Sequence, residues 1–174
     1  DFAEAIVDNL SSQYCIDQDR LYGIGYSLGS MFTYEIACQL NHRFAAVASF
    51  AGTMPVDPET CELVGGMGVL HIHGKLDYII DYDDDWDWKD GEHEGVGTMS
   101  NVPGMIEAWS MRANCGSSDT DADFFLEHIT HSDCFGGARV EHYGIEFWEH
   151  TWPDEVDGTP TYQLMWDFLS DFTN

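Results

Sequence analysis

A serine at position 27 lies within the pattern Gly-Tyr-Ser-Leu-Gly at residues 25–29, and this pattern can place a nucleophile. An apolar run precedes it and at least ten residues of helical pattern follow, which is typical of a sharp strand-to-helix turn with the serine at its apex. We expect glycine to be required at Gly25 and Gly29, because side chains there would strike the neighbouring strand and helix. A serine held in this way attacks acyl carbons. The alternative is an ordinary glycine-bearing turn.

A serine nucleophile needs a base, and the base needs an acid that orients it. Asp77 directly follows an apolar run at residues 67–73, and His150 follows the last predicted strand and precedes the last helix. We therefore predict Asp77 as the orienting acid and His150 as the base that takes the proton of Ser27. The backbone N–H of Leu28, the residue after the nucleophile, is the expected oxyanion donor.

Other histidines and aspartates leave metal chemistry open as an alternative. His71 and His73 alternate along one strand and could join Asp77 in a zinc site, or they could simply pack beside the serine site. A run of aspartates could hold calcium, but it lacks the glycine of a helix-loop-helix calcium site, so a solvated loop is favoured. These aspartates are Asp81, Asp83, Asp84, Asp85 and Asp87. We expect no metal and no organic cofactor. The remaining histidines, apart from His93 in the acidic segment, are expected on the surface: His42, His128, His131 and His142.

Aromatic side chains near these residues are candidates for substrate contacts. Tyr26 precedes the serine and Trp152 lies two residues after His150, so both are predicted to bind substrate. For Trp86 and Trp88, a substrate groove and ordinary packing are equally consistent with the sequence.

The elements that position these residues alternate between strands and helices. Strands are predicted at residues 20–26, 44–50, 67–73, 124–129 and 139–145, and helices at 2–14, 28–40, 103–111 and from 159 onward. This order predicts an α/β fold with a mostly parallel sheet. Residues 1–174 form one domain with a polar, acidic insertion at about 81–97.

Several separated motifs resemble secreted esterases grouped with polyhydroxybutyrate depolymerases and feruloyl or acetylxylan esterases. They are Cys-Ile-Asp-Gln-Asp-Arg-Leu-Tyr at 15–22, Phe-Ala-Ala-Val at 44–47 with Ala51-Gly52, His-Ile-His-Gly-Lys-Leu-Asp at 71–77, Trp109 with Asn114-Cys115, and His-Thr-Trp-Pro at 150–153. The resemblance implies an α/β-hydrolase with helices on both faces of the sheet, Ser27 as nucleophile, Asp77 as acid and His150 as base. Ser30 stands where a third glycine is usual. The strands and second oxyanion donor that precede the elbow in that family are absent, so we expect this chain to be the C-terminal part of a longer domain.

Five cysteines favour an oxidising compartment, and we expect a secreted protein. The chain just before the elbow strand and the end of the helix after it should be neighbours, which predicts a Cys15–Cys38 bridge. Similar esterases carry a bridge equivalent to Cys115–Cys134. Cys61 would be left over.

The composition limits the partners. With 32 acidic and 6 basic residues the formal net charge is −26, so the surface should repel nucleic acids and anionic membranes. The acidic surface fits either adaptation to salt or a generic acidic secreted protein. The predicted function is hydrolysis of feruloyl or acetyl esters of polysaccharides, with a polyester as the second substrate class. The alternative of another class is a non-catalytic fragment or a carbohydrate-binding relic of such an esterase.

Overall fold

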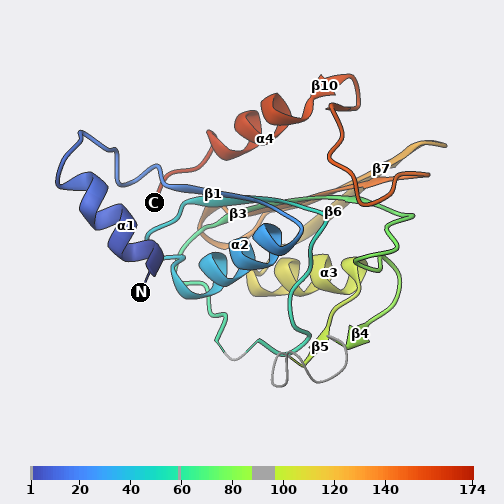
Figure 1. Cartoon of the computed structure of the whole chain (residues 1–174), viewed down its shortest axis with the longest axis horizontal. Coiled ribbons are helices and arrows are strands. Elements are labelled where there is room, and N and C mark those ends of the chain that lie inside the picture. The colour runs from blue at the N-terminus through green and yellow to red at the C-terminus, as the bar shows by residue number, and fades with distance from the viewer. Residues whose placement is uncertain (1, 59, 88–96) are drawn as a thin grey trace.

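A six-stranded sheet with helices on both faces forms the centre of the molecule (Figure 1). The computed structural model describes residues 2–58, 60–87 and 97–174. The strand order is β1-β2-β3-β8-β7-β6, and helices α2 and α3 lie on one face whereas α4 lies on the other. The predicted α/β class with helices on both faces is therefore confirmed.

The sheet has a parallel part and an antiparallel extension. The parallel strands are β1 (Tyr22–Tyr26), β2 (Ala46–Phe50), β3 (Gly68–Gly74) and β8 (Arg139–Ile145). Strands β7 (Leu126–Ser132) and β6 (Ser117–Ala122) continue the sheet in antiparallel pairs beyond β8. The parallel strands end at one edge of the sheet, where loops can bring distant side chains together.

Helices surround or flank this sheet in the described part of the chain, and short elements lie in the connections. The helices are α1 (Phe2–Ser11), α2 (Leu28–Gln39), α3 (Val102–Arg112) and α4 (Thr161–Leu169). The short elements are β4 (Trp86–Asp87), β5 (Thr98–Met99), the 3₁₀ turn Phe135–Gly137, β9 (Glu155–Val156) and β10 (Thr159–Pro160).

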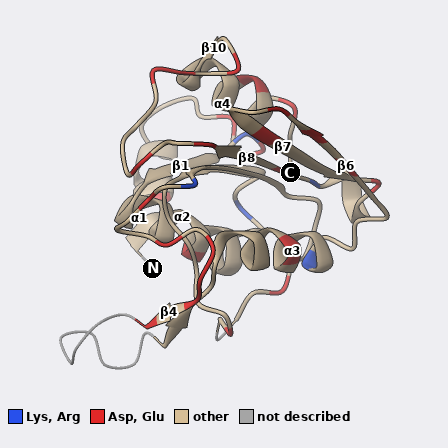
Figure 2. Ribbon diagram, turned by 90° about the vertical axis from the view of Figure 1, so that its right-hand side faces the viewer, with Lys and Arg blue, Asp and Glu red and all other residues tan. Residues whose placement is uncertain are grey.

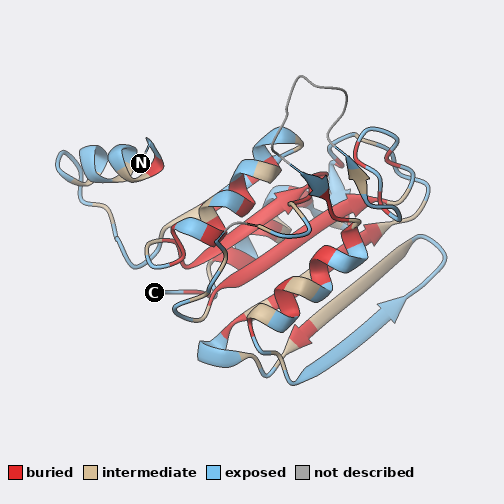
Figure 3. Ribbon diagram, turned by 90° about the horizontal axis from the view of Figure 1, so that it is seen from below, coloured by how far each residue is buried: buried red, intermediate tan, exposed pale blue. Residues whose placement is uncertain are grey.

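The core lies on both faces of the central strands, and these strands are buried along their whole length (Figure 3). Strands covered on both sides need continuous apolar or small residues, which explains the Ala-Val-Ala-Ser-Phe sequence of β2. Tyr34, Met105 and Trp109 are buried on the side of α2 and α3. Leu70 and Leu169 are buried on the side of α4.

Helix α1 does not bury its most regular apolar stripe. The apolar residues spaced four apart are exposed: Phe2, Ile6, Leu10 and Tyr14. Ala3 is buried and Val7 packs against the same core cluster. The Arg43 guanidinium adds a 3.0 Å ion pair to the Asp8 carboxylate of the helix.

Strand β6 was not predicted because its sequence, Ser-Ser-Asp-Thr-Asp-Ala, has no apolar pattern. Every residue of this strand is exposed, since β6 lies at the end of the sheet and pairs only with β7 (Figure 3). Strands are recognised in a sequence by alternating apolar and polar residues, and this alternation arises when one face of the strand is buried. Strand β6 has no buried face and therefore no such alternation.

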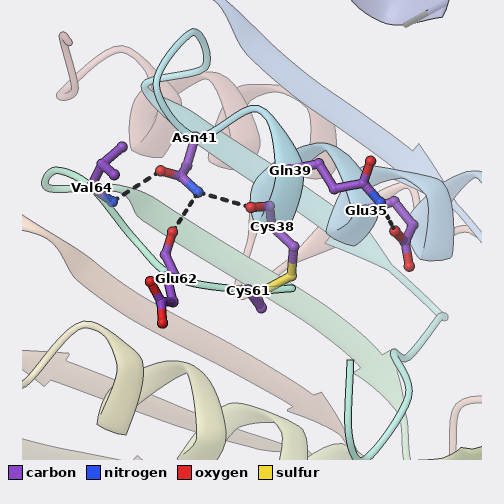
Figure 4. The surroundings of a disulfide bond; sticks show 7 residues. All are labelled: Glu35, Cys38, Gln39, Asn41, Cys61, Glu62 and Val64. Carbon is purple, nitrogen blue, oxygen red and sulfur yellow. Dashed lines mark hydrogen bonds between the residues drawn. A yellow bond between two sulfur atoms is a disulfide. The ribbon is translucent and has the colours of Figure 1, made fainter. Parts of the chain in front are cut away.

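Our prediction of a Cys15–Cys38 disulfide is wrong. Cys38 pairs with Cys61, 23 residues later (Figure 4). Cys15 is free and exposed. The reason is the path of the loop after β2, which returns to the end of α2. There the Asn41 amide donates to the carbonyls of Cys38 and Glu62 and its oxygen accepts the Val64 N–H. The Cys115–Cys134 bridge is present as expected.

Acidic side chains occur on loops, strands and helices alike, and basic ones are few (Figure 2). Lys75 contacts two of the carboxylates, Glu146 at 2.7 Å and Glu127 at 3.3 Å. Among the described residues, every helix is too short or too polar to cross a bilayer.

Candidate active site

Ser27 occupies a strained position between β1 and α2. Its φ of 55° and ψ of −121° lie outside the ordinary regions for a residue with a side chain. The Ser27 N–H donates to the Phe50 carbonyl of β2 at 2.9 Å, and the Ser27 carbonyl accepts the Met31 N–H of the first helical turn. The backbone is thus fixed on both sides of the serine, as the strand-to-helix pattern predicts.

The two glycines of this turn differ in what they permit. A Cβ on Gly25 would overlap the Gly29 carbonyl and the Thr33 hydroxyl, so glycine is required at position 25. A Cβ on Gly29 would meet nothing within 4 Å. Our expectation that Gly29 is also sterically required is therefore wrong, because the start of α2 faces open space there.

Asp77 lies in a tight turn directly after β3, and its side chain is buried. Its Oδ1 accepts the backbone N–H groups of Ile79 and Ile80, each at 2.9 Å. Its Oδ2 faces the loop after β8 and lies 2.6 Å from Nδ1 of His150. The backbone N–H groups of its own turn thus orient the Asp77 carboxylate independently of its contact with the loop after β8.

His150 is brought to Asp77 by close contact between the loops after β3 and β8. The Leu76 N–H donates to the Trp148 carbonyl at 2.9 Å. A Cβ on Gly74 would overlap that same carbonyl, so glycine at position 74 allows the two loops to meet. The contact between these two loops brings the side chains of Asp77 and His150 together.

The three predicted side chains form one hydrogen-bonded series. His150 Nδ1 lies 2.6 Å from Asp77 Oδ2, and His150 Nε2 lies 2.8 Å from Ser27 Oγ. The carboxylate can only accept, so Nδ1 carries the proton of the neutral ring and Nε2 is free to accept the Ser27 hydroxyl proton. This arrangement can activate a serine for attack on an acyl carbon.

The charge state of Asp77 follows from its surroundings. Burial raises the pKa of Asp77, but the hydrogen bonds to the carboxylate, that of His73 foremost, outweigh burial and lower the pKa to about 2. Asp77 is therefore an anion at neutral pH and can stabilise a positive charge on the His150 ring.

Leu28 begins α2, so no carbonyl of the helix can accept its N–H. The positive end of the helix dipole lies at the same place and favours a negative charge nearby. Leu28 is thus placed where an oxyanion donor is expected.

Tyr26 and Trp152 lie together beside His150. The Tyr26 ring lies 5.3 Å from the His150 ring and 6.1 Å from the Trp152 ring, and its hydroxyl donates to the His150 carbonyl. Both aromatic side chains are more than a third exposed. They provide an accessible aromatic surface next to the histidine.

His71 and His73 are fully buried in β3, with ring nitrogens that contact protein atoms. His71 Nδ1 lies 2.7 Å from the Tyr34 hydroxyl, and His71 Nε2 lies 3.0 Å from His73 Nδ1. Within the described residues, no group of three or more His, Cys, Asp or Glu side chains is placed to hold a metal ion.

Two of the histidines expected on the surface are buried. His142 in β8 is inaccessible, and His131 in β7 is almost so. The His142 Nδ1–H donates to the His71 carbonyl at 3.2 Å and Nε2 accepts the Tyr82 hydroxyl at 2.8 Å. Burial, foremost, lowers the pKa of His142 to about 3, so the ring is neutral.

The aspartates after Asp77 serve the loop that contains them. Asp81 accepts the N–H groups of Asp83 and Asp84, Asp85 accepts the backbone and side-chain N–H of Asn101, and Asp87 accepts the Thr98 hydroxyl. Trp86 belongs to β4 and is half-buried. Trp88 and most of the acidic insertion, residues 88–96, lie outside the described residues.

Sequence reasoning missed one contact of the site, the one that His73 makes with Asp77. His73 Nε2 lies 3.3 Å from Asp77 Oδ2. The spacing His-x-x-x-Asp at the end of a strand was a signal for it, because a tight turn after a strand can direct the aspartate back towards the last inward-facing residue.

The known proteins that this chain resembles in sequence include esterases. Residues 2–86 match the family model described as phospholipase/carboxylesterase. A putative esterase, NocK, from Nocardia uniformis subsp. tsuyamanensis is 31% identical over 88% of this chain and 48% of its own length. The bifunctional acetylxylan esterase/xylanase XynS20E of Neocallimastix patriciarum is 25% identical over 97% of this chain and 22% of its own length.

The structure of an acetyl xylan esterase from Aspergillus awamori is similar in fold. It superposes with a TM-score of 0.65 over 96% of this chain and 66% of that chain, at 14% identity. The present chain spans less than half the length of the two curated relatives named above.

Proposed function

We propose that this chain is a serine carboxylic-ester hydrolase, and the premise is the match of residues 2–86 to the phospholipase/carboxylesterase family. The observation that carries the proposal is the continuous contact from Asp77 through His150 to Ser27, with 2.6 Å and 2.8 Å between the bonded atoms. The ester is cleaved in two steps through an acyl-enzyme.

In the first step the Ser27 Oγ attacks the carbonyl carbon of the ester. His150 Nε2 takes the hydroxyl proton, and the resulting imidazolium is stabilised by the Asp77 carboxylate. The Leu28 N–H donates to the oxyanion of the tetrahedral intermediate. When the C–O bond to the alcohol breaks, His150 returns the proton to the leaving oxygen, and the acyl group remains on Ser27.

In the second step a water molecule attacks the acyl carbon, and His150 takes a proton from it. Collapse of the second tetrahedral intermediate breaks the bond to Ser27 Oγ, which recovers its proton from the imidazolium. The products are one carboxylic acid and one alcohol. None of these steps requires a metal or an organic cofactor.

We propose feruloyl or acetyl esters of polysaccharides as substrates. The support is the similarity to an acetylxylan esterase/xylanase and to feruloyl esterase B of Piromyces equi, which is 23% identical over 99% of this chain. The exposed rings of Tyr26 and Trp152 beside His150 suit contact with aromatic or sugar rings. A short-chain polyester would use the same apolar contacts and is the second substrate class.

The alternative of another class is a non-catalytic fragment or a carbohydrate-binding relic of such an esterase. In a relic, the exposed rings of Tyr26 and Trp152 would contact a sugar without cleavage of an ester. A fluorophosphonate probe distinguishes the two, because only an activated serine attacks the phosphorus. We expect Ser27 to be labelled, and peptide mass spectrometry should place the adduct on the peptide that contains it.

The variant Ser27→Ala should lose both labelling and hydrolysis of p-nitrophenyl acetate. Ser118→Ala, at an exposed serine of β6, is the matched control and should keep both. Methyl ferulate, acetylated xylan and a polyhydroxybutyrate suspension then separate the substrate classes. A Ser27→Ala variant that hydrolyses p-nitrophenyl acetate as fast as the original chain would contradict the proposal.

We also propose that the protein is secreted. The disulfides Cys38–Cys61 and Cys115–Cys134 support this, since such bonds persist in oxidising compartments.

A further inference from the structure

A chain of buried side chains leads from α2 through β3 to Asp77. It runs from Tyr34 to His71, from His71 to His73 and from His73 to Asp77, with distances of 2.7, 3.0 and 3.3 Å between the bonded atoms. The three side chains before Asp77 are almost completely inaccessible to solvent. The steps of ester cleavage described above use none of them.

The direction of each hydrogen bond in this chain follows from its last member. His73 Nε2 faces two atoms that can only accept, Asp77 Oδ2 at 3.3 Å and the Ile80 carbonyl at 3.1 Å. His73 must therefore carry a proton on Nε2 and shares it between them. Its Nδ1 is then the acceptor of the neutral ring, and it receives the Nε2–H of His71.

The same reasoning fixes the remaining two members. His71 uses its Nε2 proton towards His73, so its Nδ1 accepts the Tyr34 hydroxyl proton. Burial, foremost, lowers the pKa of His71 well below its usual value, and burial raises the pKa of Tyr34. His71 therefore stays neutral and Tyr34 keeps its proton, so each donates one hydrogen bond towards Asp77.

Asp77 Oδ2 thus faces two N–H groups, that of His73 Nε2 at 3.3 Å and that of His150 Nδ1 at 2.6 Å. Oδ1 is held by the backbone of its own turn. Without His73, the carboxylate would keep the hydrogen bonds of its turn but lose the second side-chain donor to Oδ2.

We propose that His73 is a positioning residue of the site formed by Ser27, His150 and Asp77. Its Nε2–H holds the Asp77 carboxylate in the orientation that accepts the His150 Nδ1–H. Tyr34 and His71 fix the tautomer of His73 that carries this proton. The inference rests on the proposed function, because positioning of Asp77 affects a rate only if Asp77 assists His150. Among the described residues, the polar contacts of the His73 ring are with His71, Ile80 and Asp77. It therefore acts on the site through Asp77.

Other ionisable groups surround His73 and must be considered in any pH measurement. His71 precedes it on β3 with ring centroids 5.2 Å apart, and Tyr82 packs edge-on against it at 5.8 Å. His142 of β8 stacks on His71 at 5.5 Å and interacts electrostatically with His73. His142 is equally buried, belongs to the same cluster and has ring nitrogens that contact other groups than Asp77, so it offers a matched control.

The test compares His73→Leu, which removes the donor, with His73→Gln, whose side-chain amide can place an N–H near the position of Nε2. For His73→Leu we expect kcat on p-nitrophenyl acetate to fall about 10- to 100-fold, the range for one lost hydrogen bond to a charged group, with KM little changed. His73→Gln should recover most of the loss. His142→Leu should lower thermal stability to a similar degree and leave kcat within about threefold.

A double-mutant cycle with Asp77→Ala separates positioning from general damage. If His73 acts through Asp77, His73→Leu should cause no further loss of kcat in the Asp77→Ala background. Equal losses of kcat in both backgrounds would show a merely structural role and overturn the inference, as would an unchanged kcat in His73→Leu alone.

A second measurement does not depend on catalysis. The Asp77 carboxyl can be titrated by carbon-13 NMR in the original chain, in His73→Leu and in His142→Leu. Loss of the donor should raise the pKa of Asp77 by about one unit or more in His73→Leu only. If the original chain neither hydrolyses esters nor reacts with the fluorophosphonate probe, the proposed function fails, and this titration still decides whether His73 holds the carboxylate.

Discussion

The side chain of Ser30 fills the space that a methyl group on Gly52 would need. A Cβ built on Gly52 overlaps both Oγ and Cβ of Ser30 and lies 2.9 Å from the Ser27 carbonyl. The Ser30 hydroxyl is buried against the Ser49 hydroxyl of β2. Ser30 is therefore accommodated by a glycine on the next loop, and both residues lie next to the turn that holds Ser27.

Gly52→Ala should destabilise the protein by about 1–3 kcal/mol, because the new methyl group is forced into a filled space. Ser30→Gly should recover part of this loss, since the contact with Ser30 disappears while that with the Ser27 carbonyl remains. Urea unfolding of the single and double variants measures the coupling. If the two changes are simply additive, the steric relationship between these residues is not the cause.

Gly25→Ala and Gly29→Ala should differ strongly. The first places a methyl group against the Gly29 carbonyl and Thr33, and we expect a loss of at least about 2 kcal/mol of stability together with ester hydrolysis. The second points into open space and should remain folded and active. Thermal unfolding and p-nitrophenyl acetate hydrolysis test both, and equal damage from the two substitutions would contradict this assignment.

Removal of the Cys38–Cys61 disulfide should lower the free energy of unfolding by about 3 kcal/mol, as estimated from the loop it closes. The double variant Cys38→Ser/Cys61→Ser avoids leaving one reactive thiol. Cys15→Ser is the matched control and should change stability little, because Cys15 is free and exposed. A large effect of Cys15→Ser in urea unfolding would instead favour the pairing that the sequence suggested.

The buried histidines should make the protein sensitive to acid. The pKa of His142 is lowered from 6.5 to about 3, so the unfolded chain binds a proton that the folded chain does not as the pH falls through this range. The contribution of the neutral, buried His142 to the free energy of unfolding is complete above about pH 6.5 and is lost progressively towards pH 3. His142→Leu should therefore show a shallower decline in unfolding free energy over this range than the original chain. Parallel declines would exclude this histidine as a source of the sensitivity.

The sequence predicted the residues that meet at the site because each follows a strand whose pattern is visible locally. Ser27, Asp77 and His150 all come directly after parallel strands or in the loops beyond them, and parallel strands end at one edge. The fold class follows from the same alternation of elements.

What the sequence could not predict depends on paths and contacts that have no local pattern. The partner of Cys38 is set by a loop that returns to the end of α2. Whether Gly29 can carry a side chain depends on the open space in front of the first turn of α2. The burial of His142 results from packing against His71 and Tyr82, whereas histidine itself is compatible with either surface or core.

Strand β6 is the last strand of the sheet in the described residues, and its composition has a consequence for behaviour at high concentration. Its side chains are all exposed and include Asp119 and Asp121 with no large apolar residue. Two copies that approached through this edge would bring like charges together before their backbones could bond. The chain thus carries its own protection against polymerising through this side of the sheet.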